Sequence, residues 1–270
     1  MNAKQKWMIG GAFALVVVLV AAAFAWFAGS DATEPTPPVA APRSPEPSAQ
    51  GNNGATGFGD PTTDLAGRKV MIPNNPAGMI LPQRDPGPRT ECSTDQPTTS
   101  PGGVMIQRTF NVATLFSETD GPTTSDGNVI SGYSRTPQGA ALAGWNVIAR
   151  SYVGGQVTVD SIRQMSVPSP ELDALLDNPD REGADPKNLQ SLQAPDAFRV
   201  LSCDPDFVSV EWGMKRTVDE NGALPSPIWK GIRTNLLWRD GDWRAQFNRE
   251  SISAGQTYSA LDGTWTRWSL

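Results

Sequence analysis

The pattern of apolar and polar positions divides the chain into an apolar N-terminal run, a long polar stretch and a region of mixed pattern. Residues 7–29 are uncharged and apolar all round. As a helix they would span roughly 34 Å, slightly more than the ~30 Å hydrocarbon core of a bilayer. Trp7 and Trp26 lie near the two ends of this run, where indole rings favour the lipid headgroups. The pattern predicts a transmembrane helix over residues 7–29, preceded by a short cytoplasmic tail, residues 1–6.

The charges that flank the apolar run predict its orientation. Lys4 and Lys6 precede it while Asp31 and Glu34 follow it, which favours a cytoplasmic N-terminus and an extracytoplasmic remainder. A cleaved secretory signal is the alternative, because residues 23–25 have the small-x-small form that a signal peptidase accepts. The run is longer than the ~7–15 residues of a usual signal core, so we expect a retained anchor in the cell membrane.

The polar stretch that follows predicts a tether and then a strap. Residues 30–67 are rich in Pro, Gly and Asn and hold few large apolar groups, so they predict a disordered linker. Residues 68–103 remain Pro-rich but contain two short apolar pieces, at 70–72 and 79–81. We expect these pieces to lie against the folded domain as an irregular strap. The external domain itself is predicted over residues 104–270.

Helical periodicity is strongest in the first half of this domain. Thr136 is a good N-cap, Pro137 suits the first helical position, and a wide apolar surface follows as far as Tyr152. Ser169 is a suitable cap for a second, shorter helix over residues 170–177. Residues 157–166 fit neither the helical nor the strand period cleanly.

The last third of the chain alternates as strands do. One strand face is predicted to be apolar and the other to carry Ser209, Glu211 and Gly213; the apolar residues are Val208, Val210, Trp212 and Met214. Together with residues 198–203, 228–238 and 243–247, this segment predicts an antiparallel meander. Short extended segments at 104–106 and 110–116 come before the helices. The fold class is therefore α+β, with a curved antiparallel sheet packed on one main helix.

Charge and composition exclude several classes of protein. Setting Lys4 and Lys6 aside leaves 20 basic against 28 acidic residues, and the basic ones are not clustered, which argues against direct nucleic acid binding. The chain has no histidine, so it lacks the commonest general base and zinc ligand. Phosphate-loop, dinucleotide and nucleophile-elbow motifs are also missing from the sequence. We therefore expect no enzyme activity, cofactor or metal.

The two cysteines, Cys92 and Cys203, lie far apart and do not form a CxxC motif. In an exported domain they are expected to pair as a disulfide, and the alternative is two unrelated buried thiols. A disulfide between them would close a loop of more than 100 residues.

Tryptophan is the other unusual component, with seven of the nine indoles in the external part. Strand-borne indoles are expected mainly to fill the core. The alternative is an aromatic ligand or partner surface of Trp212, Trp238 and Trp243. Trp265 and Trp268, in the terminal segment, fit a surface contact about as well as packing.

Close carboxylates are the remaining candidates for chemistry. The pairs are Asp204 with Asp206, Asp173 with Asp177, and Asp240 with Asp242. A glycosidase needs two carboxyl groups ~5–10 Å apart across a cleft, but a turn, a loop and a solvated helix face account for these pairs more simply.

Residues 120–143 resemble a signature of membrane proteins on conjugative and integrative elements of high-GC Gram-positive bacteria. The matching pieces are Asp120-Gly121-Pro122 and the run from Gly132-Tyr133 through Thr136-Pro137 to Ala143, with Tyr133 where the signature has Phe. The closing Gly263-x-x-x-x-Trp268 is similar too. The resemblance implies a cone-shaped domain like nuclear transport factor 2, which several assembly subunits of conjugation-type secretion channels carry outside the membrane. It implies no catalytic residue.

These features predict a single-pass, non-enzymatic scaffold or accessory subunit of a transfer or secretion apparatus. Its expected partners are the membrane and other envelope proteins, and a homo-oligomer is compatible with the pattern. Two alternatives stay open. An extracytoplasmic ligand-binding module would enclose a pocket lined by tryptophans. A cell-wall hydrolase would hold two facing carboxylates with raised pKa values.

Overall fold

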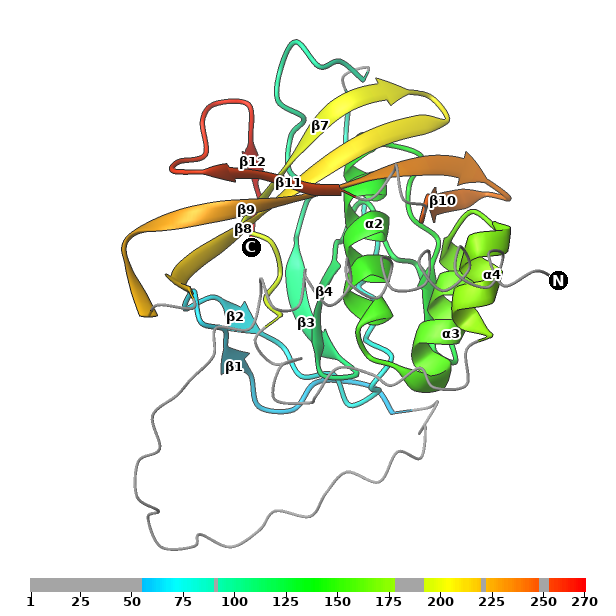
Figure 1. Cartoon of the computed structure of the whole chain (residues 1–270). Helices are drawn as coiled ribbons and strands as arrows, with labels where there is room; N and C mark the ends of the chain where they lie inside the picture. The colour runs from blue at the N-terminus through cyan, green and yellow to red at the C-terminus, as the bar shows by residue number, and fades with distance from the viewer. Residues whose placement is uncertain (1–54, 90–91, 178–191, 220–221, 248–252) are drawn as a thin grey trace, which may run out of the picture.

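The computed structural model describes residues 55–89, 92–177, 192–219, 222–247 and 253–270 (Figure 1). The predicted anchor, with Trp7 and Trp26, lies outside these ranges. Within them, no helix has the length and apolarity that crossing a membrane requires. The described part is an α+β fold with a mostly antiparallel sheet, as the sequence predicts.

A six-stranded antiparallel sheet forms one side of the domain. Its strand order is β10-β9-β8-β7-β12, and β11 pairs with residues 229–233 of β9, before the residues that pair with β10. The bounds are β7 Ala197–Asp204, β8 Phe207–Asp219, β9 Gly222–Arg239, β10 Asp242–Ala245, β11 Ser253–Tyr258 and β12 Thr266–Arg267. The predicted meander is therefore confirmed, and β9 is long enough to carry two successive partners along one edge.

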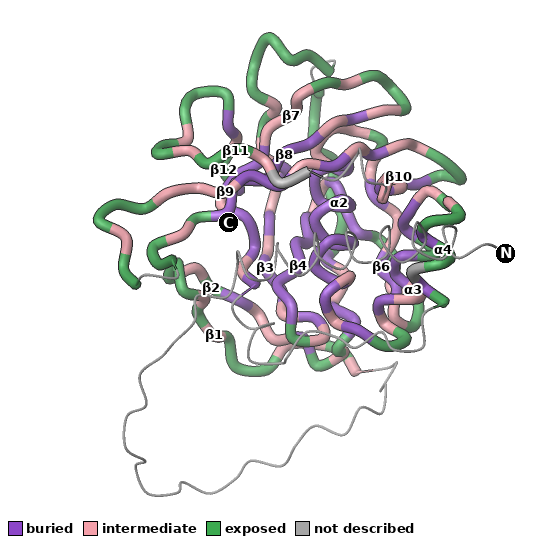
Figure 2. Tube along the Cα trace, viewed as in Figure 1, coloured by how far each residue is buried: buried purple, intermediate pink, exposed green. Residues whose placement is uncertain are grey.

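Helix α2, Pro137–Ser151, packs on the inner face of this sheet (Figures 1 and 2). Thr136 caps it as predicted, because its hydroxyl accepts from the Gly139 N–H. Gly144 allows close approach, since a Cβ there would lie 2.6 Å from the Trp212 ring. The Trp212 indole donates to the Ala141 carbonyl oxygen at 3.1 Å, so its polar edge is satisfied in the core.

A hairpin of β3, Met105–Thr109, and β4, Val112–Phe116, packs against α2 as well. Its two-residue turn places Phe110 and Asn111 at positive φ, 48° and 68°. From α2, Asn146 hydrogen-bonds both the N–H and the C=O of Leu115, at 2.8 Å each. A helix side chain thus satisfies both backbone polar groups of Leu115, whose ladder partner in β3 is Ile106.

Two shorter helices follow α2. Helix α3, Gly155–Met165, occupies the segment whose period was ambiguous, and α4, Pro170–Leu176, begins after the predicted cap Ser169. The buried stripe of α3 includes Thr158 and Ser161 as well as Ile162 and Met165. Both hydroxyls donate to buried carbonyl oxygens, which explains why an apolar period alone did not identify this helix.

The predicted boundary at residue 67 between linker and strap is wrong. Residues 55–67 of the predicted linker are described, and β1, Thr62–Thr63, pairs with β2, Lys69–Val70. The Asp64 carboxylate accepts from the backbone N–H groups of Ala66 and Arg68 and so forms the turn. Val70 is buried in the main core, so the folded unit begins well before the predicted residue 104.

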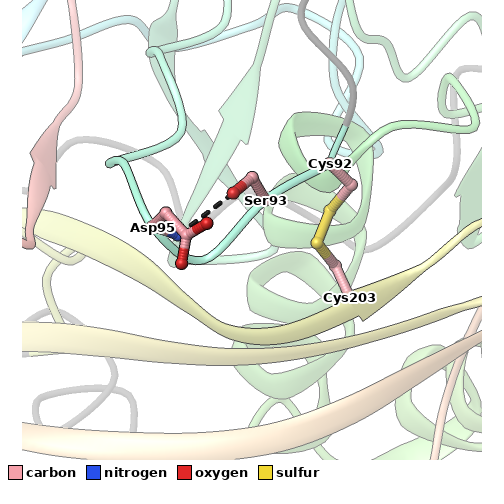
Figure 3. The surroundings of a disulfide bond; sticks show 4 residues. All are labelled: Cys92, Ser93, Asp95 and Cys203. Atoms are coloured by element: carbon pink, nitrogen blue, oxygen red, sulfur yellow. Dashed lines mark hydrogen bonds between the residues drawn. A yellow bond between two sulfur atoms is a disulfide. The ribbon is translucent and has the colours of Figure 1, made fainter.

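The predicted disulfide is present. Cys92 in the strap and Cys203 in β7 are bonded, with Cα atoms 6.1 Å apart and a sequence separation of 111 (Figure 3). The bond ties the strap to the central sheet. Closing so long a loop contributes on the order of 4–5 kcal/mol in chain-entropy models.

Candidate functional site

A polar groove of about 640 Å³ lies where three parts of the domain meet. They are the turn between β5, Thr124–Asp126, and β6, Val129–Ser131; the second half of α3; and the turn between β9 and β10. Its lining carries three carboxylates and three guanidinium groups, from Asp126, Asp160, Asp240, Arg163, Arg239 and Arg244. Such a lining suits a polar ligand that brings both hydrogen-bond donors and acceptors.

The β9–β10 turn positions the cationic side of the groove. Asp240 and Gly241 form its two-residue loop with positive φ angles of 53° and 78°. In the β-ladder that follows, Arg239 lies directly opposite Asp242, and Leu237 lies opposite Arg244. Because strand side chains alternate, Arg239, Asp242 and Arg244 share one face of the hairpin.

Asp242 holds this hairpin to the rest of the domain. Its carboxylate accepts from the N–H groups of Gly132 at 2.7 Å and Tyr133 at 3.2 Å, after β6, and of Trp243 at 2.8 Å. Burial raises the pKa of Asp242, and the three N–H groups and the charge of Arg244 offset part of that rise. The carboxylate therefore joins the β9–β10 hairpin to residues 132 and 133, which directly follow β6.

The opposite wall is fixed around Asn128. Its amide donates to Asp160 of α3 at 2.9 Å, and its carbonyl oxygen accepts from Arg150 and Ser161. Arg150 is fully buried in α2 and also donates to the Ala77 carbonyl oxygen in the strap. Burial lowers the pKa of Arg150 to about 10, so the side chain stays charged at neutral pH. Strap, helix and β5–β6 turn are thereby joined beneath the groove.

Some polar groups in the groove lack partners among the described residues. Arg239 and Arg244 make no side-chain hydrogen bond or ion pair there, whereas Arg163 pairs with Asp177. Ser166 lines the groove and is 2% exposed, yet its hydroxyl has no partner in the described part. Two guanidinium groups and a hydroxyl donor are the groups with which proteins bind a carboxylate or phosphate.

The alternative of an exposed tryptophan surface does not hold for four of its five members, and the main expectation, that strand-borne indoles fill the core, is met by Trp212 and Trp243. Trp212, Trp243, Trp265 and Trp268 are buried, and only Trp238 is partly exposed. The Trp243 indole donates to the Ser134 carbonyl oxygen, and Trp268 stacks on Phe198 with ring centroids 4.5 Å apart. None of the five lines the groove in the described structure. Trp212, Trp243 and Trp268 belong to the main core, Trp238 packs against it, and Trp265 lies edge-on to Tyr258.

The carboxylate pairs predicted as weak catalytic candidates have separate environments. Asp204 is exposed at the end of β7 and Asp206 in the turn that follows, where it pairs with Arg135. Asp173 and Asp177 are exposed on and just after α4. Within the described residues, no three His, Cys, Asp or Glu side chains converge as metal ligands.

Sequence reasoning missed a buried charge cluster centred on Glu211. This residue was placed on the polar face of β8, but the structure buries it completely. Its carboxylate pairs with Arg199 at 2.6 Å and Arg233 at 3.0 Å and accepts from the Tyr258 hydroxyl at 3.0 Å. A Cβ at Gly231 would lie 2.2 Å from the carboxylate. The available signal was Arg233, which lies directly opposite Glu211 in the β8–β9 ladder, with Gly231 two residues before it.

A second cluster explains part of the 120–143 motif. Asp120, 1% exposed, accepts from Arg89 of the strap and from the hydroxyls of Thr119, Ser134 and Thr136. Burial alone would raise the pKa of Asp120, but these hydrogen bonds and the Arg89 charge outweigh it and lower the pKa. The motif therefore joins the strap to the start of α2.

Fold and geometry define a disulfide-linked α+β domain with a charged surface groove. Residues 71–267 match the model of a family described as a domain of unknown function, DUF8175. Because the match covers most of the chain, the protein belongs to this family. Comparison with curated proteins and with solved structures gives no match.

Proposed function

We propose that this protein is a membrane-anchored, non-enzymatic scaffold whose external domain contacts other envelope proteins of a conjugative transfer or secretion apparatus. The observation that carries the proposed location is the disulfide between Cys92 and Cys203. Disulfides persist in oxidising compartments outside the cytosol and are rare within it. The apolar run at residues 7–29 supports the anchor, and the resemblance of residues 120–143 supports the apparatus.

Tethering gives such a scaffold its physical rationale. A domain held at the membrane meets membrane partners at a high effective concentration, so weak contacts suffice. The sheet that packs on α2 supports the further proposal of a cone-like architecture similar to nuclear transport factor 2. The groove supplies a surface with fixed charges where a partner could be recognised.

The location is tested by protease accessibility on intact cells, together with mass measurement of the membrane-extracted chain. We expect protease to remove the external domain from intact cells and the extracted chain to retain residues 7–29. A chain protected until lysis, or one cut near residue 25 and found in the culture fluid, would refute the anchor.

The partner is tested by crosslinking in cells that carry the transfer element. A photo-crosslinking residue at exposed position 126, beside the groove, is expected to capture a defined envelope protein. The matched control places the same residue at exposed position 267, in β12. Capture at neither position, or of the same proteins at both, would count against a specific docking role.

A second candidate is an extracytoplasmic ligand-binding module, which the groove specifically favours. A volume of about 640 Å³ is within the range of small-ligand sites, although its lining is charged rather than aromatic. The ligand-binding alternative expected an aromatic pocket lined by tryptophans, but no tryptophan lines this groove in the described structure.

A further inference from the structure

We infer that the groove binds a peptide through a free carboxylate, with Arg239 and Arg244 as the groups that bind that carboxylate. The inference rests on the proposed function, because the peptide would be a segment of an envelope partner. It is argued from three features: the guanidinium groups of Arg239 and Arg244, which make no side-chain hydrogen bond or ion pair within the described residues, the buried hydroxyl beside them, and the carboxylates across the groove. The charge of Arg244 also acts on Asp242.

The two arginines are placed to act together. Arg239 faces Asp242 across the hairpin, and Arg244 lies two residues beyond Asp242 on the same face. Diagonal neighbours of this kind have Cα atoms about 7–8 Å apart, which long side chains can bridge. Both guanidinium groups can therefore reach one carboxylate, each with donors in a planar fork that matches its oxygens.

Ser166 adds a neutral donor next to the arginines. A backbone bridge pairs it with Ala245, the residue after Arg244, and Val167 donates to the Ala245 carbonyl oxygen at 2.9 Å. Its hydroxyl is buried without a partner among the described residues. A buried hydroxyl left without a partner costs free energy, which a bound oxygen would recover.

The carboxylates in the groove decide between a peptide and a bare phosphate. Asp126 and Asp240 have no ion pair or side-chain hydrogen bond within the described structure. They would repel a multiply charged phosphate, whereas they can accept from the N–H groups of a peptide backbone. A ligand with one carboxylate and several N–H donors matches both sides of the groove.

The walls are held in place before any ligand binds. Asp242 fixes the arginine-bearing hairpin with three backbone N–H groups. Asn128 joins the opposite wall to Asp160 and Arg150. A preformed site loses less conformational entropy on binding, so short peptides can be retained measurably.

The test is equilibrium dialysis of the purified full-length chain against a pool of tetrapeptides with randomised sequence and free C-terminal carboxylates. Mass spectrometry measures the retained peptides. The same pool with C-terminal amides, and the free-acid pool with inorganic phosphate added, form two further arms. The double variant R239Q/R244Q removes the proposed carboxylate ligands. R267Q is the matched control, because Arg267 is exposed on β12, away from the groove.

We expect the wild-type chain and R267Q to retain a subset of free-acid peptides about tenfold over R239Q/R244Q, because two charge-assisted contacts are lost. The amide pool should not be retained, and phosphate should not displace the peptides. Unfolding midpoints of the wild-type chain and R267Q should agree, and that of R239Q/R244Q should be only slightly lower, because Asp242 loses the favourable charge of half-buried Arg244.

Three outcomes would overturn the inference: no retained free-acid peptide, equal retention of amides, or retention unchanged in R239Q/R244Q. Displacement of the peptides by phosphate would also overturn it, because the groove would then be a site for simple anions. None of these outcomes alters the protease and crosslinking tests of location and partner. Peptide retention by a chain that proves to be cytosolic would refute the proposed function and leave the groove's chemistry intact.

Discussion

Replacing Glu211 with glutamine tests whether the buried charge cluster holds the outer face of the sheet together. The carboxylate of Glu211 joins Arg199 of β7, Arg233 of β9 and Tyr258 of β11. Glutamine keeps the size of the side chain but removes its charge and turns one of the two acceptors into a donor that faces guanidinium groups. The two arginines then lose their shared counter-ion.

The expected magnitude follows from the exposure of the partners. Glu211 is 0% exposed, while the side chains of Arg199 and Arg233 are 19% and 33% exposed. Breaking a fully buried ion pair costs about 3–5 kcal/mol, whereas exposed pairs contribute about 0–1 kcal/mol. Water can reach both arginines in part, so we expect E211Q to lower the free energy of unfolding by about 2–3 kcal/mol.

The assay is urea unfolding of the purified chain with its disulfide intact, followed by tryptophan fluorescence and by circular dichroism to test for a single transition. The matched control is D206N, because Asp206 forms an exposed ion pair with Arg135. We expect D206N to change stability by at most about 1 kcal/mol. A change for E211Q no larger than that for D206N would refute the reasoning.

Three further predictions concern other buried contacts. Replacing Cys92 and Cys203 together with serine should lower the unfolding free energy by about 3–5 kcal/mol in urea, because the disulfide closes a loop of 111 residues; a loss below about 1 kcal/mol would contradict this. Asp120 has a lowered pKa, so its ionised form stabilises the fold above the unfolded pKa near 4, and this contribution is lost as pH falls through the folded pKa. D120N should therefore be less stable than the wild type at neutral pH, and the difference in unfolding free energy should narrow as the pH falls. A difference that does not depend on pH would contradict a lowered pKa for Asp120. G144A should lower the thermal midpoint, because a Cβ 2.6 Å from the Trp212 ring costs about 1–3 kcal/mol and outweighs a gain in helix propensity of about 1 kcal/mol; G263A, with open space around it, serves as the control.

Local sequence signals identified the elements that the chain determines over short distances. Thr136 and Ser169 each precede a proline and a helical apolar pattern, and both cap the predicted helices. Alternation predicted β8, and the Asp240-Gly241 pair predicted the turn into β10. These predictions succeeded because a cap, a turn or a strand face depends on residues a few positions apart.

The groove could not be predicted in the same way. Its walls come from the β5–β6 turn, α3 and the β9–β10 turn, which are separated by long stretches of sequence. The local pattern marks Asp240 as a turn residue and as a neighbour of Asp242, but it gives no reason to group the arginines beside them. The aromatic alternative failed because strand alternation alone does not say which indoles another segment covers.

Local patterns and simple counting were enough to predict the α+β class, the main helix with its cap, the antiparallel meander and the cysteine pair. Long-range packing, in contrast, buries Glu211 and Asp120, brings part of the predicted linker into the fold and places two arginines on a common groove. The physical reason is that burial and charge pairing depend on which distant segments meet. A residue's own neighbours in the chain do not specify that meeting.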